Sequence, residues 1–435
     1  MKRAADSASA RGEARALDAA DELRDFRRRF ELPKDNGRSL TYLCGHSLGA
    51  MPRAARRAIN LEIDRWAERG ADGHLPDGSS RRGAHAGWID FHQRFAAPLA
   101  ALVGAKADEV VAMNTLTVNL HLMLVSFFSP NAQRYKIVIE RNAFPSDRYA
   151  VVSHLRLHGL EPREALIELD PEPGTWQFDR ARFEALLRTE GERIALVLLP
   201  GVQYLSGEVL DVATLTAAAA RYGCKVGFDL AHAIGNVPVS LHKAGVDFAV
   251  WCSYKYLNAG PGAVGGCFVH RRWAEDDALP RLAGWWGHDR DRRFLMEPDF
   301  KPLVGAEGWQ LSNPPIFSLA PLAASLDLFA AAGAQRLRRK SQRLTARLEA
   351  SLLASLGKRV KVLTPREPAR RGCQLSVQIE PAPRAPQGLA RRLRAQGVVA
   401  DWRRPNVLRL APVPLYNRFQ DLDLAVRALA RALDA

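Results

Sequence analysis

The chain has 435 residues, of which 47% are hydrophobic and 25% are charged, and these values are ordinary for a globular protein with a large core. Its formal net charge is +15, but the arginines are spread along the whole sequence and no nucleic-acid-binding motif accompanies them. We therefore expect no nucleic-acid partner, and we predict a solvated basic surface that attracts anionic substrates.

Three features of the sequence predict a cytoplasmic protein that does not bind membranes. The first 26 residues are polar and charged and lack the apolar core of a secretory signal. The longest apolar run, Leu120–Phe128, is too short to cross a bilayer. The five cysteines include no CxxC pair, and we expect buried free thiols, as in a reducing compartment.

The N-terminal region is predicted to be mainly helical. We expect a loose tail and then one arginine-rich amphipathic helix at about Glu13–Phe30, followed by a short strand that runs into a turn within Thr41–Met51. Helical patterns follow at Ala54–Arg69 and at Trp88–Val103.

From Glu109 onward, short apolar strands alternate with helices, which predicts an α/β fold with a mostly parallel sheet covered on both faces. The expected strands lie near residues 109–113, 136–140, 164–169, 194–199, 225–229, 247–252 and 264–270. After a Pro-rich turn at 313–315, a long helix at about 317–355 leads to a smaller α+β unit. We expect an N-terminal segment (1–50) that packs near the small domain, a large domain (51–315) and the small C-terminal domain (316–435).

Lys255 is the first candidate for chemistry. Only eleven of the 62 lysines and arginines are lysines, and most of them lie among polar or charged neighbours. Lys255 instead follows the apolar stretch Phe248–Cys252 and precedes a loop rich in glycine and proline. A desolvated amine loses its proton easily and becomes a nucleophile, so this lysine is a candidate to form a Schiff base with an aldehyde cofactor. A lysine that extends its amine into solvent at the end of a strand is the alternative.

A carboxylate ends the preceding apolar strand. The stretch Lys225–Asp229 ends in Asp229, and His232 follows three residues later. Because ligands of open α/β sheets bind beyond the carboxyl ends of the strands, we expect Asp229 and Lys255 in one pocket. Pyridoxal phosphate (PLP) needs this pair, a lysine for its aldehyde and an acid that keeps its pyridine nitrogen protonated.

The segment Gly260–Gly265 matches the GxGxxG pattern of dinucleotide-binding proteins but lacks their structural context. That fingerprint directly follows a strand and begins a helix. Here a polar loop comes first, and Val264–Arg271 has the composition of a strand. We therefore reject binding of a nicotinamide or flavin cofactor.

Two further segments are predicted to face the same edge of the sheet. Residues 114–119 join a strand to the helix Val118–Phe128, with Thr117 as the expected N-cap. Such a helix N-terminus is a ready phosphate site, although ordinary capping explains the same residues. Phe144–Asp147 also follows a strand and precedes a helix, and Phe144 is able to stack on a cofactor ring. A simple turn is the equal alternative for this second segment.

Eight sequence words occur in order over most of the chain: GHSLG (45–49), NTLTVNLHLML (114–124), FPSD (144–147), GFDLAHAIGN (227–236), WCSYKYLNAG (251–260), GWWGH (284–288), LSNPP (311–315) and RLAPVPLYN (409–417). In these words the chain resembles the kynureninase family, PLP-dependent enzymes with the fold of the class V aminotransferases (fold type I). Several of the words are particular to that family rather than shared across the wider fold.

The resemblance implies a role for each matching position. Lys255 would bind the cofactor covalently, Asp229 would pair with the pyridine nitrogen, and Tyr254 would contact the phosphate and act as general acid and base. The other implied cofactor contacts are Leu116, Thr117, Phe144, Pro145, Ser146, Asp147, His232, Trp285 and Asn313. The implied substrate contacts are Ser47, His74, Asn313 and Arg409, with the fork of Arg409 on the substrate carboxylate. Pro200 stands where some relatives have a hydroxyl donor to the cofactor.

The implied reaction is the hydrolysis of L-kynurenine or its 3-hydroxy form to anthranilate or 3-hydroxyanthranilate and L-alanine, in tryptophan catabolism. The sequence does not distinguish the two substrates, because they differ by one hydroxyl group and contacts in the pocket determine whether that group is accepted. The resemblance also implies a homodimer with shared active sites, in which Trp285 and Asn313 reach the partner's site. No metal ion is implied, and His154 and His158 lack a nearby third ligand.

Two alternatives remain. The first is another enzyme of the same fold, such as a cysteine desulfurase or a transaminase. A desulfurase needs a cysteine on a mobile loop, whereas Cys373 leads directly into the strand-like stretch Gln374–Ile379. The second is a basic binding protein that keeps the fold without the chemistry, and the presence of Lys255, Asp229 and Arg409 together argues against it.

Overall fold

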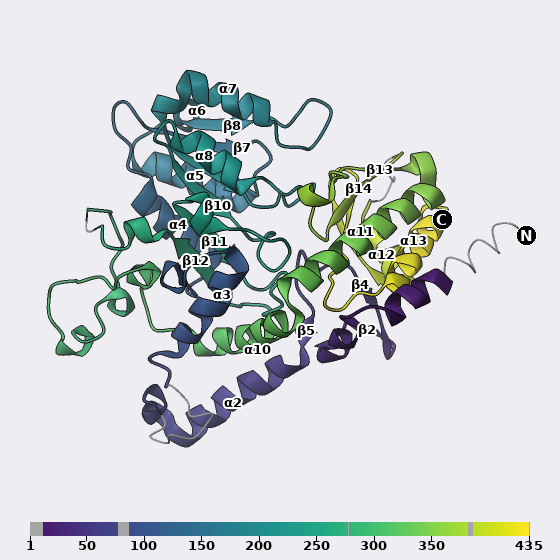
Figure 1. The fold of residues 1–435 in the computed structure, drawn as a ribbon, viewed down its shortest axis with the longest axis horizontal. Helices are drawn as coiled ribbons and strands as arrows, with labels where there is room; N and C mark the ends of the chain where they lie inside the picture. Colours follow the sequence, from purple (N-terminus) through teal and green to yellow (C-terminus); the bar gives the residue numbers. More distant parts are fainter. Residues whose placement is uncertain (1–11, 77–86, 277, 382–385, 435) are drawn as a thin grey trace, which may run out of the picture.

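The computed structural model describes residues 12–76, 87–276, 278–381 and 386–434 (Figure 1). The loose tail expected at the N-terminus lies outside the described residues. The α-helices are α2 (Arg53–Arg69), α3 (Ala96–Val103), α4 (Leu116–Phe127), α5 (Pro145–Leu157), α6 (Pro162–Ala165), α7 (Arg180–Glu190), α8 (Val212–Ala220), α9 (Leu241–Ala244), α10 (Ile316–Ala332), α11 (Ala334–Leu356), α12 (Pro386–Ala395) and α13 (Phe419–Asp434). The strands are β1 (Phe30–Glu31), β2 (Lys34–Asp35), β3 (Arg38–Ser39), β4 (Thr41–Tyr42), β5 (Met51–Pro52), β6 (Val110–Val111), β7 (Lys136–Glu140), β8 (Leu166–Leu169), β9 (Ile194–Pro200), β10 (Lys225–Asp229), β11 (Phe248–Cys252), β12 (Gly265–Val269), β13 (Val360–Val362), β14 (Leu375–Ile379), β15 (Val398–Val399), β16 (Asp401–Arg403) and β17 (Val407–Leu410).

The large sheet has seven strands in the order β6-β12-β11-β10-β9-β7-β8. The pairs from β8 through β7, β9 and β10 to β11 are all parallel, whereas β12 runs antiparallel to both β11 and β6. The predicted α/β fold with a mostly parallel sheet is therefore confirmed. Gly265 begins the strand β12 and not a helix, which agrees with the rejection of a dinucleotide site.

Helices cover both faces of this sheet, because alternate side chains of a strand point to opposite faces. In β7, Ile137 and Ile139 pack in one core with side chains of α4 and α5. Val138, which lies between them, packs in the other core with side chains of α3, α7 and α8. The unbroken apolar run of each central strand thus reflects burial on two sides.

A smaller antiparallel sheet, in the order β13-β14-β17-β16, lies apart from the large one, on the right in Figure 1. Helices α11, α12 and α13 bury leucines against it, among them Leu348, Leu393 and Leu422. The N-terminal segment joins this unit because β4 pairs in parallel with β15. The smaller α+β unit expected from the sequence is therefore present.

Two long helices predicted from the sequence are broken in the structure. The N-terminal one is helical over residues 12–19 and continues only as a short 3-10 helix, Arg24–Arg29, because the carboxylate of Asp21 accepts the N–H of Leu23 and closes a turn. The helix expected at 317–355 is two helices, α10 and α11. Gly333 separates them with a φ of 76°, a conformation that favours glycine.

Two smaller boundaries also differ from the expectation. The helical pattern at Trp88–Val103 becomes a 3-10 helix, Phe91–Phe95, followed by α3. The strand expected at 109–113 is only Val110–Val111, because Asn114 has a φ of 48° and turns the chain toward α4.

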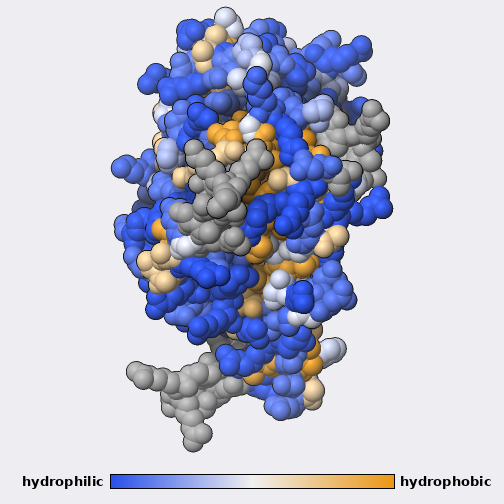
Figure 2. All heavy atoms as spheres, turned by 90° about the vertical axis from the view of Figure 1, so that its right-hand side faces the viewer, coloured by the Kyte–Doolittle hydropathy of each residue, from blue (hydrophilic) through white to orange (hydrophobic). Residues whose placement is uncertain are grey.

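The surface and the thiols follow the sequence expectations. All five cysteines are buried and free. The arginine-rich part of α11 exposes Arg339, which pairs with Glu22, while Leu344 and Leu348 of the same helix are buried. The face in Figure 2 is correspondingly hydrophilic over most of its area. No single helix in the described part of the chain is long and apolar enough to cross a membrane, whereas α10 and α11 pass that test only as a pair bent by 83°.

Candidate active site

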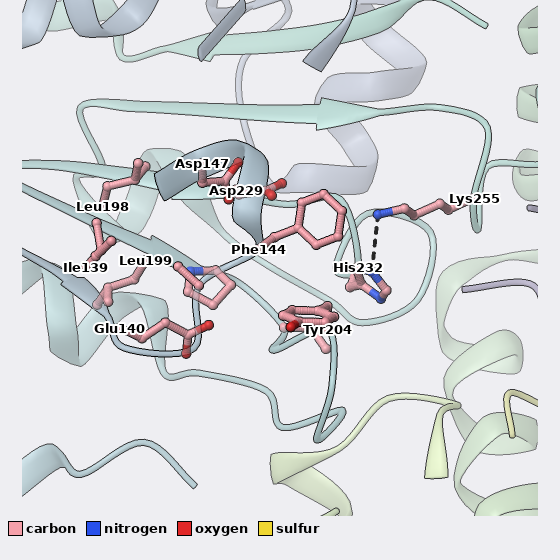
Figure 3. A pocket seen from close by; sticks show the side chains of 13 residues that line it. Ile139, Glu140, Phe144, Asp147, Leu198, Leu199, Tyr204, Asp229, His232 and Lys255 are labelled. Carbon is pink, nitrogen blue, oxygen red and sulfur yellow. Dashed lines mark hydrogen bonds between the residues drawn. The ribbon is translucent and has the colours of Figure 1, made fainter. Parts of the chain in front are cut away.

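A cavity lies at the carboxyl ends of the central strands of the large sheet (Figure 3). Strands β7, β9 and β10 end in Glu140, Pro200 and Asp229, and the loop after β11 brings Lys255 to the same place. The lining residues are Ile139, Glu140, Ala143, Phe144, Asp147, Leu198, Leu199, Pro200, Val202, Tyr204, Asp229, His232 and Lys255. Five residues predicted for the cofactor site are thus brought together: Phe144, Asp147, Asp229, His232 and Lys255.

The amine of Lys255 is held by a neutral histidine. Its Nζ lies 3.1 Å from Nε2 of His232, and 5.7 Å from the ring centroid of Phe144. Burial, and then the charge of Lys255, holds the pKa of His232 well below its usual value. The other ring nitrogen of His232, Nδ1, is buried without a hydrogen-bond partner. Tyr254 lies beside the lysine, with its ring centroid 5.9 Å from Nζ.

Two buried carboxyl groups, Asp147 and Asp229, lie together on the far side of Phe144 from Lys255 (Figure 3). Asp229 accepts the N–H of Ala231 at 2.7 Å. Burial raises the pKa of both carboxyl groups, and the neighbouring charge of Asp229 raises that of Asp147 further, whereas Lys255 and the N–H of Ala231 oppose the rise at Asp229. Asp229 is therefore the group of the pair that ionises more readily. Oδ1 of Asp147 has no hydrogen-bond partner. The pair is therefore suited to bind a cationic N–H group in the cavity.

These unpaired groups fit PLP. A protonated pyridine nitrogen supplies the cationic N–H that Asp229 requires, and the amine of Lys255 is available to the aldehyde. The ring of Phe144 is 40% exposed and forms one wall of the cavity, so it offers a flat surface for a planar cofactor. The residues present thus match the two ends and one face of the cofactor.

The start of α4 offers N–H groups to a phosphate. The helix begins at Leu116, so Thr117 lies in its first turn, and the prediction that Thr117 is the N-cap is wrong. Thr115 is the N-cap because Asn114 turns the chain one residue earlier, and Thr117 Oγ1 instead hydrogen-bonds to Ser146 Oγ at 2.9 Å. This turn lies close to the end of β11. Gly265 pairs with Cys252, the last residue of β11, and a Cβ added to Gly265 would be 3.1 Å from the nitrogen of Leu116.

The segment 45–49 packs directly on the lysine loop. The N–H of Gly49 donates to the carbonyl of Tyr254 at 2.8 Å, and a Cβ at Gly49 would collide with the carbonyl of Lys255. Glycine is required at this close approach. Ser47 is exposed in the same turn, so the position predicted to contact substrate lies in a turn that packs on the loop carrying Lys255.

Arg409 lies on β17, behind Tyr204 as seen from the cavity. It is 1% exposed, and its NH1 group donates to the carbonyl of Tyr204 at 2.7 Å. The ring of Tyr204 meets that of Phe144 edge-on, with centroids 5.4 Å apart. Arg409 therefore touches the cavity wall through Tyr204 but does not itself line the cavity in this structure.

Like Arg409, three more of the predicted residues do not line this cavity in the single chain. His74 ends the 3-10 helix after α2 and packs edge-on against Trp88. Trp285 is 43% exposed and donates its indole N–H to the carbonyl of Arg293. Asn313 lines a second cavity beside the start of α4. Their roles as cofactor or substrate contacts stay predictions.

Sequence reasoning missed several residues of the cavity wall. Glu140 is buried, its carboxylate accepts the side-chain amide of Gln203 at 3.1 Å, and burial raises its pKa to about 7. The signal was present, because Glu140 ends an apolar strand as Asp229 does. Pro200 lies opposite Asp229 in the sheet and offers no hydroxyl, and Tyr204 is the hydroxyl-bearing residue among those that line the cavity.

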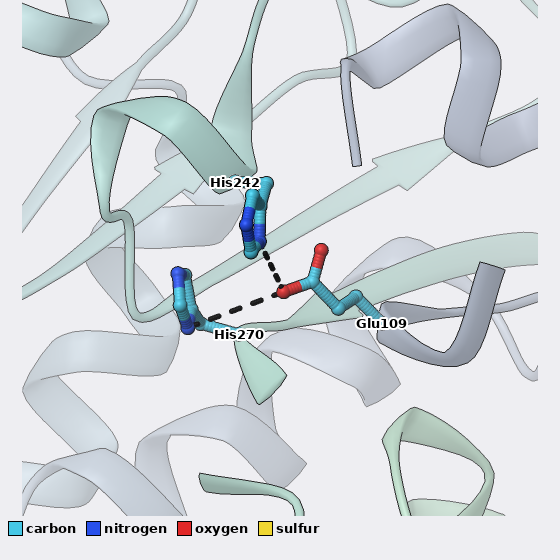
Figure 4. Close-up of side chains that lie close together, drawn as sticks. All are labelled: Glu109, His242 and His270. Atoms are coloured by element: carbon cyan, nitrogen blue, oxygen red, sulfur yellow. Dashed lines mark hydrogen bonds and ion pairs between the residues drawn. The ribbon is translucent and has the colours of Figure 1, made fainter. Parts of the chain in front are cut away.

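A second titratable cluster, Glu109, His242 and His270, lies elsewhere and has the residue types of a metal site (Figure 4). Its geometry argues against one. The two imidazole rings are stacked at 4.9 Å with planes only 10° apart, whereas a metal must lie near the plane of each ligating ring. In addition, the nitrogen of His270 that faces Glu109 already accepts the N–H of Arg272. The cluster is better described as a hydrogen-bonded carboxylate with two histidines.

Comparison with known proteins bears on the identity of this site. Residues 337–429 match the kynureninase C-terminal domain, and residues 83–245 match the DegT/DnrJ/EryC1/StrS aminotransferase family. Kynureninases of Xanthomonas euvesicatoria pv. vesicatoria and Xanthomonas oryzae pv. oryzae are each 52% identical over 95% of this chain and 96% of their own length. The chain belongs to the kynureninase family. As a member of that family it is a PLP-dependent hydrolase of tryptophan catabolism.

Solved structures show the same fold at low identity. The cysteine desulfurase CsdA of Escherichia coli has a TM-score of 0.76 at 16% identity, covering 95% of this chain and 98% of that one. A mutant of the cystine C–S lyase C-DES with glycine linked to its PLP has a TM-score of 0.74 at 19% identity, covering 90% and 96%. These identities support the fold alone. For the desulfurase alternative, Cys373 is unsuited as a nucleophile, because burial raises its pKa to about 12.

Proposed function

We propose that this chain hydrolyses L-kynurenine or its 3-hydroxy form to anthranilate or 3-hydroxyanthranilate and L-alanine. The observation that carries the proposal is the cavity in which Lys255 and Asp229 lie on opposite sides of Phe144. This arrangement supports PLP chemistry, and the 52% identity to kynureninases favours the kynureninase reaction over other reactions of the fold.

Different side chains would hold different parts of the cofactor. Bound PLP supplies an electron sink through its protonated ring. Asp229, held charged, would keep the ring nitrogen protonated, and Phe144 would support the ring face. Leu116 and Thr117 would donate N–H groups to the phosphate, with Pro145, Ser146 and Asp147 at the neighbouring start of α5.

Lys255 and Tyr254 would move the protons. Lys255 would take the α-proton of the substrate, while the neutral His232 accepts a hydrogen bond from the amine and keeps it in place. Burial raises the pKa of Tyr254 above its usual value, so its phenol stays protonated at neutral pH and would serve as the proton donor when the carbon–carbon bond breaks. Arg409 would bind the substrate carboxylate, and Ser47 and His74 would face the aromatic amine.

Direct assay tests this function. The purified enzyme with PLP should release anthranilate and alanine from L-kynurenine, and turnover of the 3-hydroxy form should differ through contacts to the single extra hydroxyl group. Comparing kcat/KM for the two substrates would identify the preferred one. Release of sulfide from cysteine, or transfer of an amino group to an oxo acid, without anthranilate formation would instead support another enzyme of the fold.

We also propose that the protein acts as a homodimer in the cytoplasm. Large apolar side chains are exposed on α2 and in the segment 282–304, which is unusual for a surface that faces water. They are Leu61, Ile63, Trp66, Leu282, Trp285, Phe294, Leu295, Met296, Phe300 and Val304. Such a surface suits a second copy of the chain, which would bring Trp285 and Asn313 of one protomer to the site of its partner.

The separate sheets support the division at residues 50 and 315 as our domain proposal.

Subunit mixing tests the shared site. Lys255→Ala and Asn313→Ala dimers are each expected to be inactive. In a hybrid dimer, one site carries both changes and the other site carries neither. Random exchange makes about half of the dimers hybrids, so roughly a quarter of wild-type activity should return.

A matched mixture controls this experiment. Lys255 and Asp229 are contributed to one cavity by one chain, so mixing Lys255→Ala with Asp229→Asn should restore no intact site. Subunit exchange is verified by mass. If exchange is complete and Lys255→Ala with Asn313→Ala regains no activity, the shared-site proposal is wrong.

A further inference from the structure

Arg409 and Asp401 form a pair that is built into the small sheet. They lie directly opposite each other on β17 and β16. Oδ2 of Asp401 accepts from Nε of Arg409 at 2.6 Å and lies 2.5 Å from NH2. Because the two residues are cross-strand neighbours, the backbone register itself holds the carboxylate against one edge of the guanidinium.

This contact leaves a particular edge of the guanidinium available. The group has five N–H donors in a fixed plane. Asp401 takes the edge formed by Nε and NH2, and the carbonyl of Tyr204 takes one N–H of NH1. One N–H of NH1 and one of NH2 remain beyond these contacts, and the end of a guanidinium formed by NH1 and NH2 carries one N–H of each in parallel. Two parallel N–H groups are the arrangement that binds a carboxylate through both oxygens.

The local charges also suit one incoming carboxylate. Burial opposes ionisation of Asp401, but His46 and Arg409 hold its pKa well below the usual range, so it stays charged. His46 lies 3.7 Å from Asp401, and burial lowers its pKa to about 3, which makes it neutral. Arg403 also donates to Asp401, at 2.9 Å. Two arginines and one aspartate leave a single positive charge, which one substrate carboxylate would neutralise.

We propose that Asp401 is the positioning residue of the substrate-carboxylate site: it fixes one edge of Arg409 so that the opposite end, with its two parallel N–H groups, receives the carboxylate. This inference rests on the role of Arg409 in the proposed function. Without Asp401, the guanidinium would remain buried with two unpaired donors and would be free to turn. Asp401 itself touches neither substrate nor cofactor.

Asp401→Asn tests the inference, because it keeps the shape of the side chain and removes the charge. In the holoenzyme the variant should raise KM on the order of 10- to 100-fold while changing kcat much less. The loss should also depend on the carboxylate. Inhibition by the decarboxylated amine of the substrate, which has no group for Arg409, should be unchanged, whereas inhibition by L-alanine should weaken in step with KM.

A variant of Arg409 separates this inference from the proposed function. Arg409→Lys should raise KM strongly, because a point charge replaces a planar fork. If Arg409→Lys leaves KM unchanged, the carboxylate site of the proposed function is wrong. If Arg409→Lys raises KM but Asp401→Asn stays within about twofold of wild type, only the positioning role fails, because loss of a buried charge partner is expected to cost more than that.

Controls guard against a general effect on the small domain. Asp423→Asn removes another aspartate of that domain, which pairs with Arg347 at 3.3 Å between α13 and α11, and it should leave both inhibitors and KM unchanged. Equal weakening of L-alanine and the decarboxylated amine by Asp401→Asn would overturn the inference. If the asparagine variant does not fold, Asp401→Glu, which keeps the charge but displaces it by one methylene, should show the same carboxylate-dependent rise in KM.

Discussion

Replacing Lys255 with alanine is expected to abolish turnover and to leave the fold intact. The side chain makes one hydrogen bond, to His232, and lies in a loop rather than in a sheet or core helix. Its loss therefore costs little stability, whereas the reaction loses both the amine for the cofactor aldehyde and the base for the α-proton. Loss of a positioned acid–base group alone lowers rates about 10²- to 10⁴-fold, and the covalent role adds to this.

Anthranilate release measured by its fluorescence, with the melting temperature measured beside it, checks the prediction. Lys243→Ala is the matched control, because Lys243 is an exposed lysine of α9 with no part in the cavity. It should keep full activity. Normal anthranilate release by Lys255→Ala would remove the basis of the mechanism, whatever the fate of the control.

The position of this lysine could be predicted because it follows from strand order and composition. Parallel strands share their carboxyl ends, so polar residues that end apolar runs converge at one edge. The same rule applied to β7 would have found Glu140, which ends the run KIVIE. Sequence reasoning used the rule for Asp229 and Lys255 and missed the third case, although the signal was equally clear.

Residues brought together by antiparallel pairing could not be predicted in this way. Asp401 lies beside Arg409 only because β16 and β17 adopt one register, and no local pattern fixes that register. His46, also buried, reaches the same place from the N-terminal segment through the turn that packs on Tyr254. Contacts between distant parts of the chain therefore determine the surroundings of Arg409.

The predicted helix boundaries were wrong for a local reason. The apolar and arginine-rich pattern of residues 316–356 continues through Gly333, so periodicity alone predicts one helix. The left-handed backbone at Gly333 and the packing of α10 against α2 decide the break. Similarly, the positive φ of Asn114 moved the start of α4, and with it the expected N-cap, by two residues.

Replacing Asp229 with asparagine is expected to leave PLP bound but to lower kcat by about two orders of magnitude or more, the scale of losing one preorganised electrostatic contact at a reacting centre. The asparagine amide carries no charge, so the ring nitrogen would lose the anion that keeps it protonated. The backbone bond from the N–H of Ala231 can still be made to the amide oxygen, so the local fold should persist. Cofactor absorption and single-turnover rates measure the two effects separately.

Asp147→Asn is the matched control, and its expected result follows from the protonation of the pair. Burial and the charge of Asp229 raise the pKa of Asp147, so this carboxyl holds its proton more readily than Asp229 does. Its amide should therefore reduce kcat far less than the amide at position 229. When Asp229 is neutral, however, Asp147 loses the repulsion that kept it protonated and becomes able to ionise. The double variant Asp147→Asn/Asp229→Asn should consequently be slower than Asp229→Asn alone. Near-normal turnover by this double variant would show that neither carboxylate keeps the pyridine nitrogen of the cofactor protonated.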